Sequence, residues 1–494
     1  MKIVLVIDQF DDSNNGTTVT ARRFAGQLRR RGHEVVILAG GAPCEGKICA
    51  PVHRIPVFQK LIESQGMCFA KPDEEAYYTA FKDADIVHFY MPFRFCRRGE
   101  ELARQMGIPT VAAFHVQPEN ITSSIFLGKN RRVNDFLYWW FYKVFYNRFD
   151  HIHCPSAFIA RQLESHGYGA KLWVISNGVA DAFRPAQVPR APELEGRFTI
   201  LMIGRLSGEK RQDLIIEAAK RSKYADRLQL VFAGKGPKEK AYRKLAAGLA
   251  HPPVFGFYGQ DELRRLINMC DLYVHASDAE IEGISCMEAL ACGLVPVISD
   301  SPLSATGQFA LCAESLFRAG DADDLARRID YWVEHPEEKR AYAEQYALRQ
   351  DENRVEACVA RAGNPGQAAQ RLPQGAPQPL AALHKPQLRG HPAQFLSGRY
   401  SAHAVVLAVH HAAFSHPVAA GPPLAGRQDR RPGKSRRRAG RCGQHNEPCS
   451  SAGLHHGKGG AVSLQAVVYQ FGVQPAKAIY RLAHPLLRRR AAAG

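Results

Sequence analysis

The sequence predicts an α/β protein of two domains followed by an irregular C-terminal tail. Through residues 1–350, short apolar runs of strand length alternate with segments of helical period. Glycine, arginine, lysine or glutamate follows several of these runs, at the strand ends where open parallel sheets bind ligands. We expect Rossmann-like domains at 1–176 and 198–350, a linker at 177–197, and a basic tail at 351–494 that is disordered or out of frame.

The first domain opens with a strand–helix–strand unit. Residues 2–8 form an apolar run, residues 11–18 a polar loop, and a helix is expected to continue to Arg31. A second strand follows at 35–39, which gives the right-handed βαβ pattern. Gly16 lies in the polar loop, where a residue without a Cβ allows close approach of a ligand to the backbone. The loop has no Gly-x-Gly-x-x-Gly pattern, so it is not a dinucleotide-binding loop.

Two further strands are expected at 85–89 and 109–114, and His115 follows the second one. A histidine at this strand end can hydrogen-bond a ligand between the domains. The alternative is a packed core histidine with its hydrogen bonds satisfied. His151 and His153 also lie at a strand end, and we interpret both as structural.

The second domain begins with the apolar run 198–203. It leads into Gly204, Arg205 and, after a short loop, Lys210, before a helix through 213–219. Arg205 can bind a diphosphate through two parallel hydrogen bonds, and Lys210 can add a compact positive charge. The alternative is a surface loop in which the arginine pairs with Glu209.

The next strand, 228–233, runs directly into Gly234, and a Gly-Pro pair follows at 236–237. Proline near the end of a glycine-rich turn is typical of the start of a helix. This unit therefore repeats the strand–glycine–helix arrangement of the preceding one.

Two glutamates eight positions apart mark the third unit. After a strand at 272–276, the loop carries Glu280 and Gly283, and a helix carrying Glu288 ends near Gly293. N–H groups at the start of this helix, at Ile284 and Ser285, can bind an anion, and the carboxylates can accept hydrogen bonds from sugar hydroxyls. The alternative is an ordinary surface helix with solvated glutamates.

Together these segments resemble the group 1 (family 4) retaining glycosyltransferases, which have the GT-B architecture of two Rossmann-like domains facing across a cleft. Four motifs occur in the family's order, within a resemblance that covers residues 1 to about 345. They are the segments 204–210, 234–237, 280–288 and 288–293.

The resemblance implies a sugar transfer from a nucleoside-diphosphate sugar with retention at the anomeric carbon. It implies that Arg205 and Lys210 neutralise the leaving diphosphate, that Glu280 and His115 hold the transferred sugar, and that Glu288 holds the ribose. Backbone at Gly16, Gly204, Gly234, Gly283, Ile284 and Ser285 would contact the donor. We expect no metal and no cofactor besides the donor substrate, because cations and a helix start supply positive charge and no Asp-x-Asp metal motif stands in a matching place.

The composition points to a cytoplasmic enzyme. No run of eighteen apolar residues is present, and Met1 and Lys2 lead directly into a strand rather than into a signal peptide. The twelve cysteines lack Cys-x-x-Cys spacing, so reduced thiols are expected.

The net charge of +18 lies mostly in the tail, which holds 20 Lys and Arg against 5 Asp and Glu. One interpretation is a basic arm that binds nucleic acid or anionic lipid. The other, which we favour, is translation in a shifted frame. Codons able to encode three tail segments can, after a shift of one base, encode segments resembling glycerolipid acyltransferases in the order of that family. The hypothesis predicts a frame change near residues 356–366, and no nucleic-acid partner.

Residues 131–148 are dense in aromatic and basic side chains, which suits a helix lying in a lipid interface. A core helix of the first domain is the equal alternative. With the acyltransferase resemblance, this segment favours a membrane glycerolipid acceptor over a carbohydrate one, and peripheral attachment at the inner face of the membrane. The alternative functions are a sugar-nucleotide epimerase of the same architecture and an inactive truncated product with an anion-binding tail.

Overall fold

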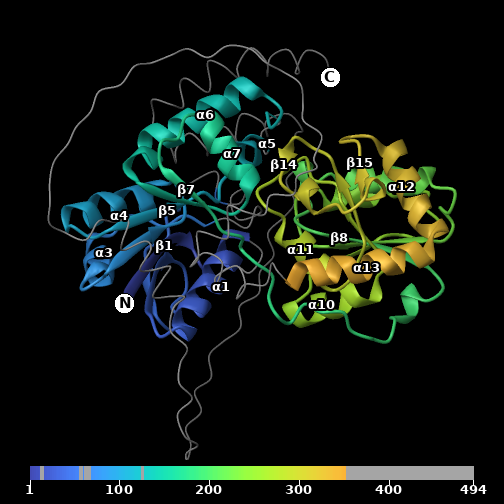
Figure 1. The fold of residues 1–494 in the computed structure, drawn as a ribbon, viewed down its shortest axis with the longest axis horizontal. Helices are drawn as coiled ribbons and strands as arrows, with labels where there is room; N and C mark the ends of the chain where they lie inside the picture. Colours follow the sequence, from blue (N-terminus) through green and yellow to red (C-terminus); the bar gives the residue numbers. More distant parts are fainter. Residues whose placement is uncertain (12–15, 55–58, 60–67, 124–126, 352–494) are drawn as a thin grey trace, which may run out of the picture.

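Two parallel β-sheets, each with its own apolar core, form the protein (Figure 1). The computed structural model describes residues 1–11, 16–54, 59, 68–123 and 127–351. The predicted α/β class with two domains is confirmed. The predictions made for the tail lie outside the described residues.

The first sheet has seven strands in the order β3-β2-β1-β4-β5-β6-β7. Every neighbouring pair in this sheet is parallel. The strands are β1 (Lys2–Gln9), β2 (Glu34–Gly40), β3 (Lys47–Ala50), β4 (Ile86–Phe89), β5 (Thr110–Ala113), β6 (His151–Cys154) and β7 (Lys171–Val174). Its helices are α1 (Gly16–Arg30), α3 (Glu74–Phe81), α4 (Arg94–Gln105), α5 (Pro118–Ser123), α6 (Arg131–Val144), η1 (Tyr146–Arg148) and α7 (Ala157–Ser165).

The second sheet has six parallel strands in the order β10-β9-β8-β11-β13-β15, and β12 and β14 form a separate pair. The strands are β8 (Phe198–Ile203), β9 (Leu228–Ala233), β10 (Val254–Gly256), β11 (Leu272–His275), β12 (Ala279–Glu280), β13 (Pro296–Ser299), β14 (Leu303–Ser304) and β15 (Leu316–Phe317). The helices are η2 (Pro192–Leu194), η3 (Gly208–Lys210), α8 (Gln212–Arg221), α9 (Glu239–Leu245), α10 (Gln260–Met269), α11 (Ile284–Ala291), η4 (Thr306–Phe309), η5 (Ala313–Ser315), α12 (Ala322–Glu334) and α13 (Pro336–Asp351).

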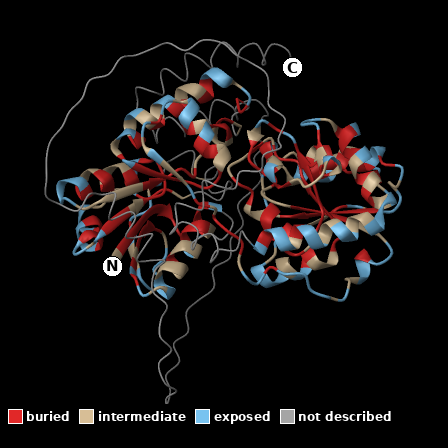
Figure 2. Ribbon diagram, viewed as in Figure 1, coloured by how far each residue is buried: buried red, intermediate tan, exposed pale blue. Residues whose placement is uncertain are grey.

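The central strands are buried on both faces, as parallel sheets covered by helices require (Figure 2). In β1 only Lys2 is not fully buried, and in β9 every residue is buried. Burial of each large apolar side chain contributes about 1.5–3 kcal/mol to folding stability. Because the buried side chains form two separate clusters, each core stabilises its own domain.

Local sequence signals set the beginnings of several helices. Asp73, Asn130, Ser156 and Asp321 each accept a hydrogen bond from a first-turn N–H group, before α3, α6, α7 and α12. The last helix, α13, packs against α11 in the second domain.

The domains meet through a few polar contacts. The Ser156 hydroxyl donates to the carbonyl of Ile281 at 2.6 Å, and the Gln117 amide donates to the carbonyl of Leu303 at 3.0 Å. Ile281 also packs against the core of the first domain. The loop that carries Glu280 therefore lies directly against the first domain.

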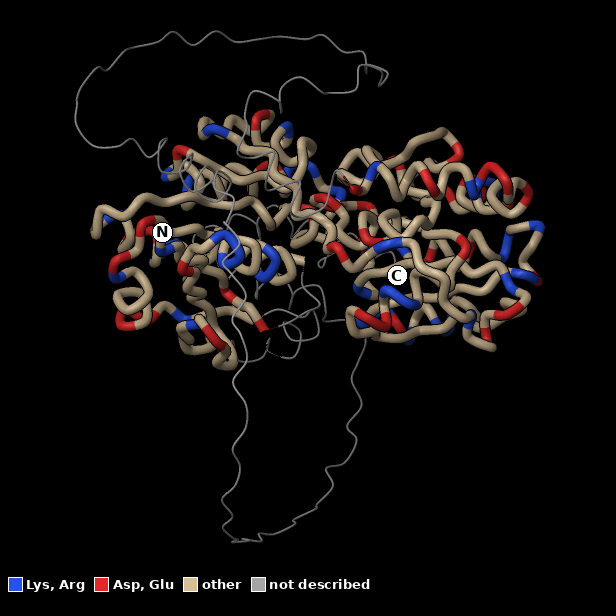
Figure 3. The backbone as a smooth tube through the Cα atoms, turned by 60° about the horizontal axis from the view of Figure 1, so that its bottom comes forward, with Lys and Arg blue, Asp and Glu red and all other residues tan. Residues whose placement is uncertain are grey.

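Basic and acidic residues alternate over both domains rather than gathering in one field (Figure 3). No helix in the described part of the chain combines the length and apolarity that crossing a bilayer needs.

Candidate active site

The first part of the site is the backbone at the end of β8. Gly204 follows the strand, and the Lys210 stem lies 3.7 Å from the position that a Cβ on Gly204 would take. Gly234, at the end of β9, lies so close that a Cβ there would be 2.1 Å from the Gly204 carbonyl oxygen. The two glycines thus let neighbouring loops touch through their backbones.

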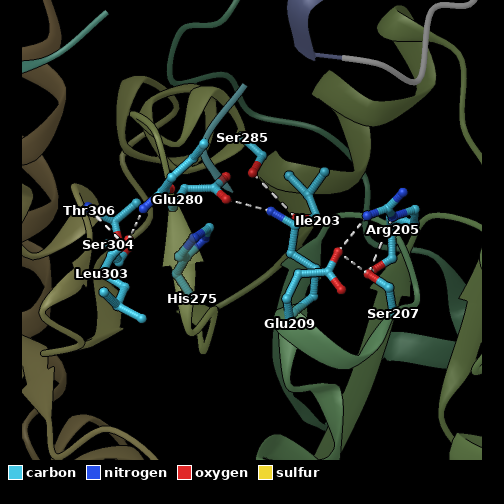
Figure 4. A network of polar contacts seen from close by, with 12 residues as sticks. Ile203, Arg205, Ser207, Glu209, His275, Glu280, Ser285, Leu303, Ser304 and Thr306 are labelled. Carbon is cyan, nitrogen blue, oxygen red and sulfur yellow. Dashed lines mark hydrogen bonds and ion pairs between the residues drawn. The ribbon is translucent and has the colours of Figure 1, made fainter. Parts of the chain in front are cut away.

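Arg205 is held by two neighbours in its own loop (Figure 4). Its guanidinium contacts the Glu209 carboxylate at 2.6 Å, and the Ser207 hydroxyl donates to the same carboxylate at 2.6 Å. Burial alone would raise the pKa of Glu209, but Arg205 and Ser207 outweigh it and lower that pKa below its usual value. The salt bridge considered from the sequence is therefore present, and it fixes the arginine beside the end of β8.

Lys210 pairs with Glu280, which is labelled in Figure 4, beyond the ends of the neighbouring strands β8 and β11. The ammonium group of Lys210, at the end of η3, donates to Glu280 at 2.6 Å, and both side chains are mostly buried. The His275 side chain lies beside this pair at the end of β11, and burial lowers its pKa to about 4 even though Glu280 acts to raise it. The ring is neutral at physiological pH, so the local charges are those of the lysine and the glutamate.

The helix α11 begins at a glycine that no other residue can replace without strain. Gly283 has φ +92°, and a Cβ there would lie 2.4 Å from the Thr306 methyl carbon. Ile284 and Ser285 follow as the first helical residues, whose N–H groups have no intrahelical acceptor. The Ser285 hydroxyl lies 3.3 Å from the carbonyl of Ile203, next to the end of β8.

Gly16 brings the first domain to this helix. It is the first residue of α1, and a Cβ on it would be 3.9 Å from the Ile284 side chain. Two backbone segments predicted separately to contact the donor therefore face one another across the domain boundary.

Glu288 lies inside α11 and is buried, with only 7% of its side chain exposed. Its carboxylate forms an ion pair with Arg23, which comes from α1 of the first domain. Burial raises the pKa of Glu288 although Arg23 acts to lower it.

His115 lies two residues beyond β5 among other aromatic rings. It stacks on Tyr90 with ring centroids 5.4 Å apart and meets His153 edge to face at 5.3 Å. Burial lowers the pKa of His115 well below its usual value, and His153 and His88 add to this effect. The imidazole is therefore neutral, which suits hydrogen bonding to a hydroxyl rather than holding an anion.

The structure brings the predicted residues into two groups. One group lies at one end of the second sheet and contains Arg205, Lys210, Glu280 and the start of α11, with Gly16 facing it. The other is His115, at the corresponding end of the first sheet. His153, interpreted as structural, donates from Nε2 to the carbonyl of Ile175 at 2.7 Å and also contacts the ring of His115.

Two residues at the domain boundary were not singled out from the sequence. Arg23 stands seven positions after Gly16, hence on the same face of α1, and this spacing was the available signal. Glu282 lies between the two predicted glutamates. It is fully buried, which raises its pKa to about 7, and it accepts a hydrogen bond from the N–H of Asn177 at 3.0 Å.

Two facing domains with parallel sheets, and a cation-rich loop opposite a helix start, define a glycosyltransferase of the GT-B type. The family model for "Glycosyl transferases group 1" matches residues 184–350, and that for "Glycosyltransferase Family 4" matches residues 14–183. The two matches together span most of the chain, which therefore belongs to the group 1 glycosyltransferases.

Two relatives are about a quarter identical to this chain over the aligned residues. A GDP-mannose-dependent alpha-mannosyltransferase of Mycolicibacterium smegmatis is 27% identical over 66% of this chain and 86% of its own length. Alpha-monoglucosyldiacylglycerol synthase of Streptococcus pneumoniae is 25% identical over 60% of this chain and 71% of its own length.

Solved structures show the same fold. Anabaena HepE in complex with UDP and glucose has a TM-score of 0.55 at 15% identity, and the match covers 72% of this chain and 97% of that one. WaaG, a glycosyltransferase involved in lipopolysaccharide biosynthesis, has a TM-score of 0.55 at 16% identity, with 76% and 100% covered.

The stability of the second domain should depend on the close contact between the loops at Gly204 and Gly234. Gly234→Ala places a Cβ against the Gly204 backbone, so the loops must separate, at a cost of about 1–3 kcal/mol. We expect a lower urea midpoint and reduced sugar transfer. Gly208→Ala is the control, because no described atom lies within 4 Å of its added Cβ. Equal unfolding midpoints for the two variants would contradict the prediction.

Proposed function

We propose that the chain transfers a hexose from a nucleoside-diphosphate sugar to a hydroxyl group of a membrane glycerolipid, with retention of the anomeric configuration. The Lys210–Glu280 pair carries this proposal, because a cation lies beside a carboxylate that can accept hydrogen bonds from sugar hydroxyls, at the end of the second sheet. Because both family models that match this chain are glycosyltransferase models, we favour sugar transfer over the epimerase alternative.

The donor is proposed to bind mainly to the second domain. Arg205 and Lys210 stabilise the negative charge that grows on the leaving diphosphate, and the first N–H groups of α11 add to this field. Glu280 accepts hydroxyl hydrogen bonds from the transferred sugar, and Glu288 accepts those of the ribose. The neutral His115 contacts the sugar from the first domain.

The lipid acceptor is supported by the outer surface of α6. Arg132, Phe136, Trp139 and Lys143 follow one another at spacings of four, three and four, so they form one stripe along the helix. Trp139 is 49% exposed, and its ring lies 5.6 Å from that of Phe136. The opposite face, with Leu137 and Phe141, is buried in the domain.

A basic–aromatic–basic stripe fits the interface of an anionic bilayer, where aromatic rings lie at headgroup depth and cations meet lipid phosphates. The printed names of two similar proteins refer to glycolipids: one is a synthase named for its product, a monoglucosyldiacylglycerol, and WaaG is involved in lipopolysaccharide biosynthesis. Product analysis by nuclear magnetic resonance would test the reaction itself. A β-linked product from an α-linked donor would contradict retention.

Removal of either cation should slow the reaction. We expect Arg205→Ala and Lys210→Ala each to lower kcat by ~10²-fold or more, because each donor stabilises charge in the transition state. Arg205→Ala also leaves the buried Glu209 unpaired, so it should be measured together with Arg205→Ala/Glu209→Gln, which removes both charges. The control is Lys220→Ala on α8, which loses only a partly exposed pair with Glu217. Near-parental rates in both single variants would remove the assigned role.

The two glutamates should differ in kinetic effect. Glu288→Gln is expected mainly to raise KM for the donor, because the ribose does not react, whereas Glu280→Gln is expected mainly to lower kcat. Glu217→Gln on α8 serves as the control. Steady-state kinetics with varied donor concentration distinguish these effects, and the opposite pattern would show that the roles are exchanged.

The stripe on α6 should govern binding to lipid vesicles. Arg132→Gln/Trp139→Ser/Lys143→Gln is expected to weaken binding to phosphatidylglycerol-containing vesicles by ~10-fold or more, since each cation near an anionic surface contributes about 1 kcal/mol. Co-sedimentation at low salt measures this. The matched control is Tyr78→Ser, an aromatic side chain 51% exposed on α3. Unchanged binding of the triple variant would assign lipid contact to another part of the chain.

A further inference from the structure

One guanidinium group joins three parts of the molecule at the domain boundary. Arg23 lies on α1 of the first domain, and its Nη1 donates to the carbonyl of Gly178, between β7 and β8, at 2.6 Å. Its Nη2 donates to Oε1 of Glu288 on α11 of the second domain. Only 10% of the Arg23 side chain is exposed.

The segment that connects the domains is held from both sides at this point. Asn177 gives its N–H to Glu282 of the second domain, and the next residue, Gly178, offers its carbonyl to Arg23 of the first. The Ser176 hydroxyl accepts from the Gly178 N–H at 3.0 Å and closes the turn. A change in the placement of the domains must therefore alter the contacts of Arg23.

Glu288 depends on this arginine. Among the described residues, Arg23 is the only one that donates a hydrogen bond to the Glu288 carboxylate, and it engages one of the two oxygens. No residue in the described part of the chain donates to its second oxygen, Oε2, which can accept a hydrogen bond from a ligand hydroxyl. A buried carboxylate with a single charged partner is costly to leave unpaired.

We propose that Arg23 is a positioning residue for the nucleotide half of the donor: from the first domain it holds the Glu288 carboxylate in the orientation that receives the ribose. This inference rests on the proposed function of Glu288. It makes the nucleotide affinity of the second domain depend on where the first domain lies.

The charges around Glu288 predict how nucleotide binding should depend on pH if Arg23 has this role. In the described part of the chain, Arg23 is the only charged side chain that lowers the Glu288 pKa against the effect of burial. Tyr273 of β11 keeps its proton, because burial raises its pKa well above the usual value, and Glu282 acts on Arg23 from the loop before α11. Loss of Arg23 therefore raises the pKa of Glu288 further, and its charged form is lost at a higher pH as the solution is acidified.

The test measures binding of UDP and of GDP separately to the full chain by calorimetry, from mildly acidic to mildly alkaline pH. Arg23→Met is expected to weaken binding of the preferred diphosphate by ~10-fold or more, as loss of a charge-assisted hydrogen bond does. It should also move the acid limb of the binding profile to higher pH, and raise the donor KM with little change in kcat. Arg23→Lys, which restores the charge, should recover most of the affinity.

Arg30→Met is the matched control, because Arg30 is exposed at the end of the same helix. Glu288→Gln and the double variant Arg23→Met/Glu288→Gln complete a cycle in which the two effects should not add. The double variant also leaves no unpaired buried charge, so the comparison stands if Arg23→Met alone folds poorly.

The outcomes separate the inference from the function on which it rests. If Glu288→Gln weakens binding but Arg23→Met and Arg23→Lys bind as the parent does, the role of Arg23 is overturned and that of Glu288 stands. If the two effects add fully, or the acid limb stays in place, the positioning role is likewise overturned. If Glu288→Gln binds as the parent does, the proposed ribose contact of Glu288 fails and the inference fails with it. If the parent binds neither diphosphate, a uridine or guanosine donor is overturned.

Discussion

The ion pair between Lys210 and Glu280 is the contact on which the arrangement of the site depends. It joins the segment after β8 to the segment after β11, and these strands are neighbours in the second sheet. Because parallel strands end at the same edge, two residues seventy positions apart meet there. The lysine stem in turn lies over Gly204, and Glu280 stands on the short strand that leads into α11.

The backbone around this pair is fixed by close approach rather than by large side chains. Gly234 touches the Gly204 carbonyl, and Gly236 lies so close to Leu206 that a Cβ would be 2.3 Å from its carbonyl oxygen. Such contacts leave the loops between strands little freedom. Arg205 and Lys210 are consequently held on a rigid base, and preorganised charge is what stabilises a developing anion most effectively.

These local requirements explain why so much of the second domain could be predicted. The strands 198–203 and 228–233 were predicted with the observed bounds, because each is a mostly apolar run, broken only by Thr199 or Gln229, that ends at a glycine. Gly283 was predicted at the start of α11, where its positive φ and the nearby Thr306 methyl exclude a side chain. The requirement in each case lies within a few residues of sequence.

The contacts across the domain boundary could not be predicted in the same way. The pairing of Arg23 with Glu288 spans 265 positions. The spacing from Gly16 sets Arg23 apart from Arg22, which donates to the carbonyl of Phe10, but it does not say which residue of the other domain Arg23 meets. Likewise, the segment 131–148, which contains α6, was left open between core and lipid contact, because its aromatic residues occupy both faces of a helix. The structure shows a buried face with Leu137, as the core alternative requires, and an exposed face with Trp139, on which the proposal of lipid contact rests.

The domain boundary itself has the composition of an interface that can open and close. Each domain keeps its own apolar core, and the contacts between them are mostly polar, such as those of Gln117 and Ser156, with Ile281 and Ile284 adding small apolar ones. Interfaces between domains that are this polar allow relative motion. Arg23 differs from these contacts because it reaches a carboxylate at the site, so movement of the first domain changes the environment of Glu288 directly. A movement at this boundary would thereby change the surroundings of the carboxylate that is proposed to bind the ribose.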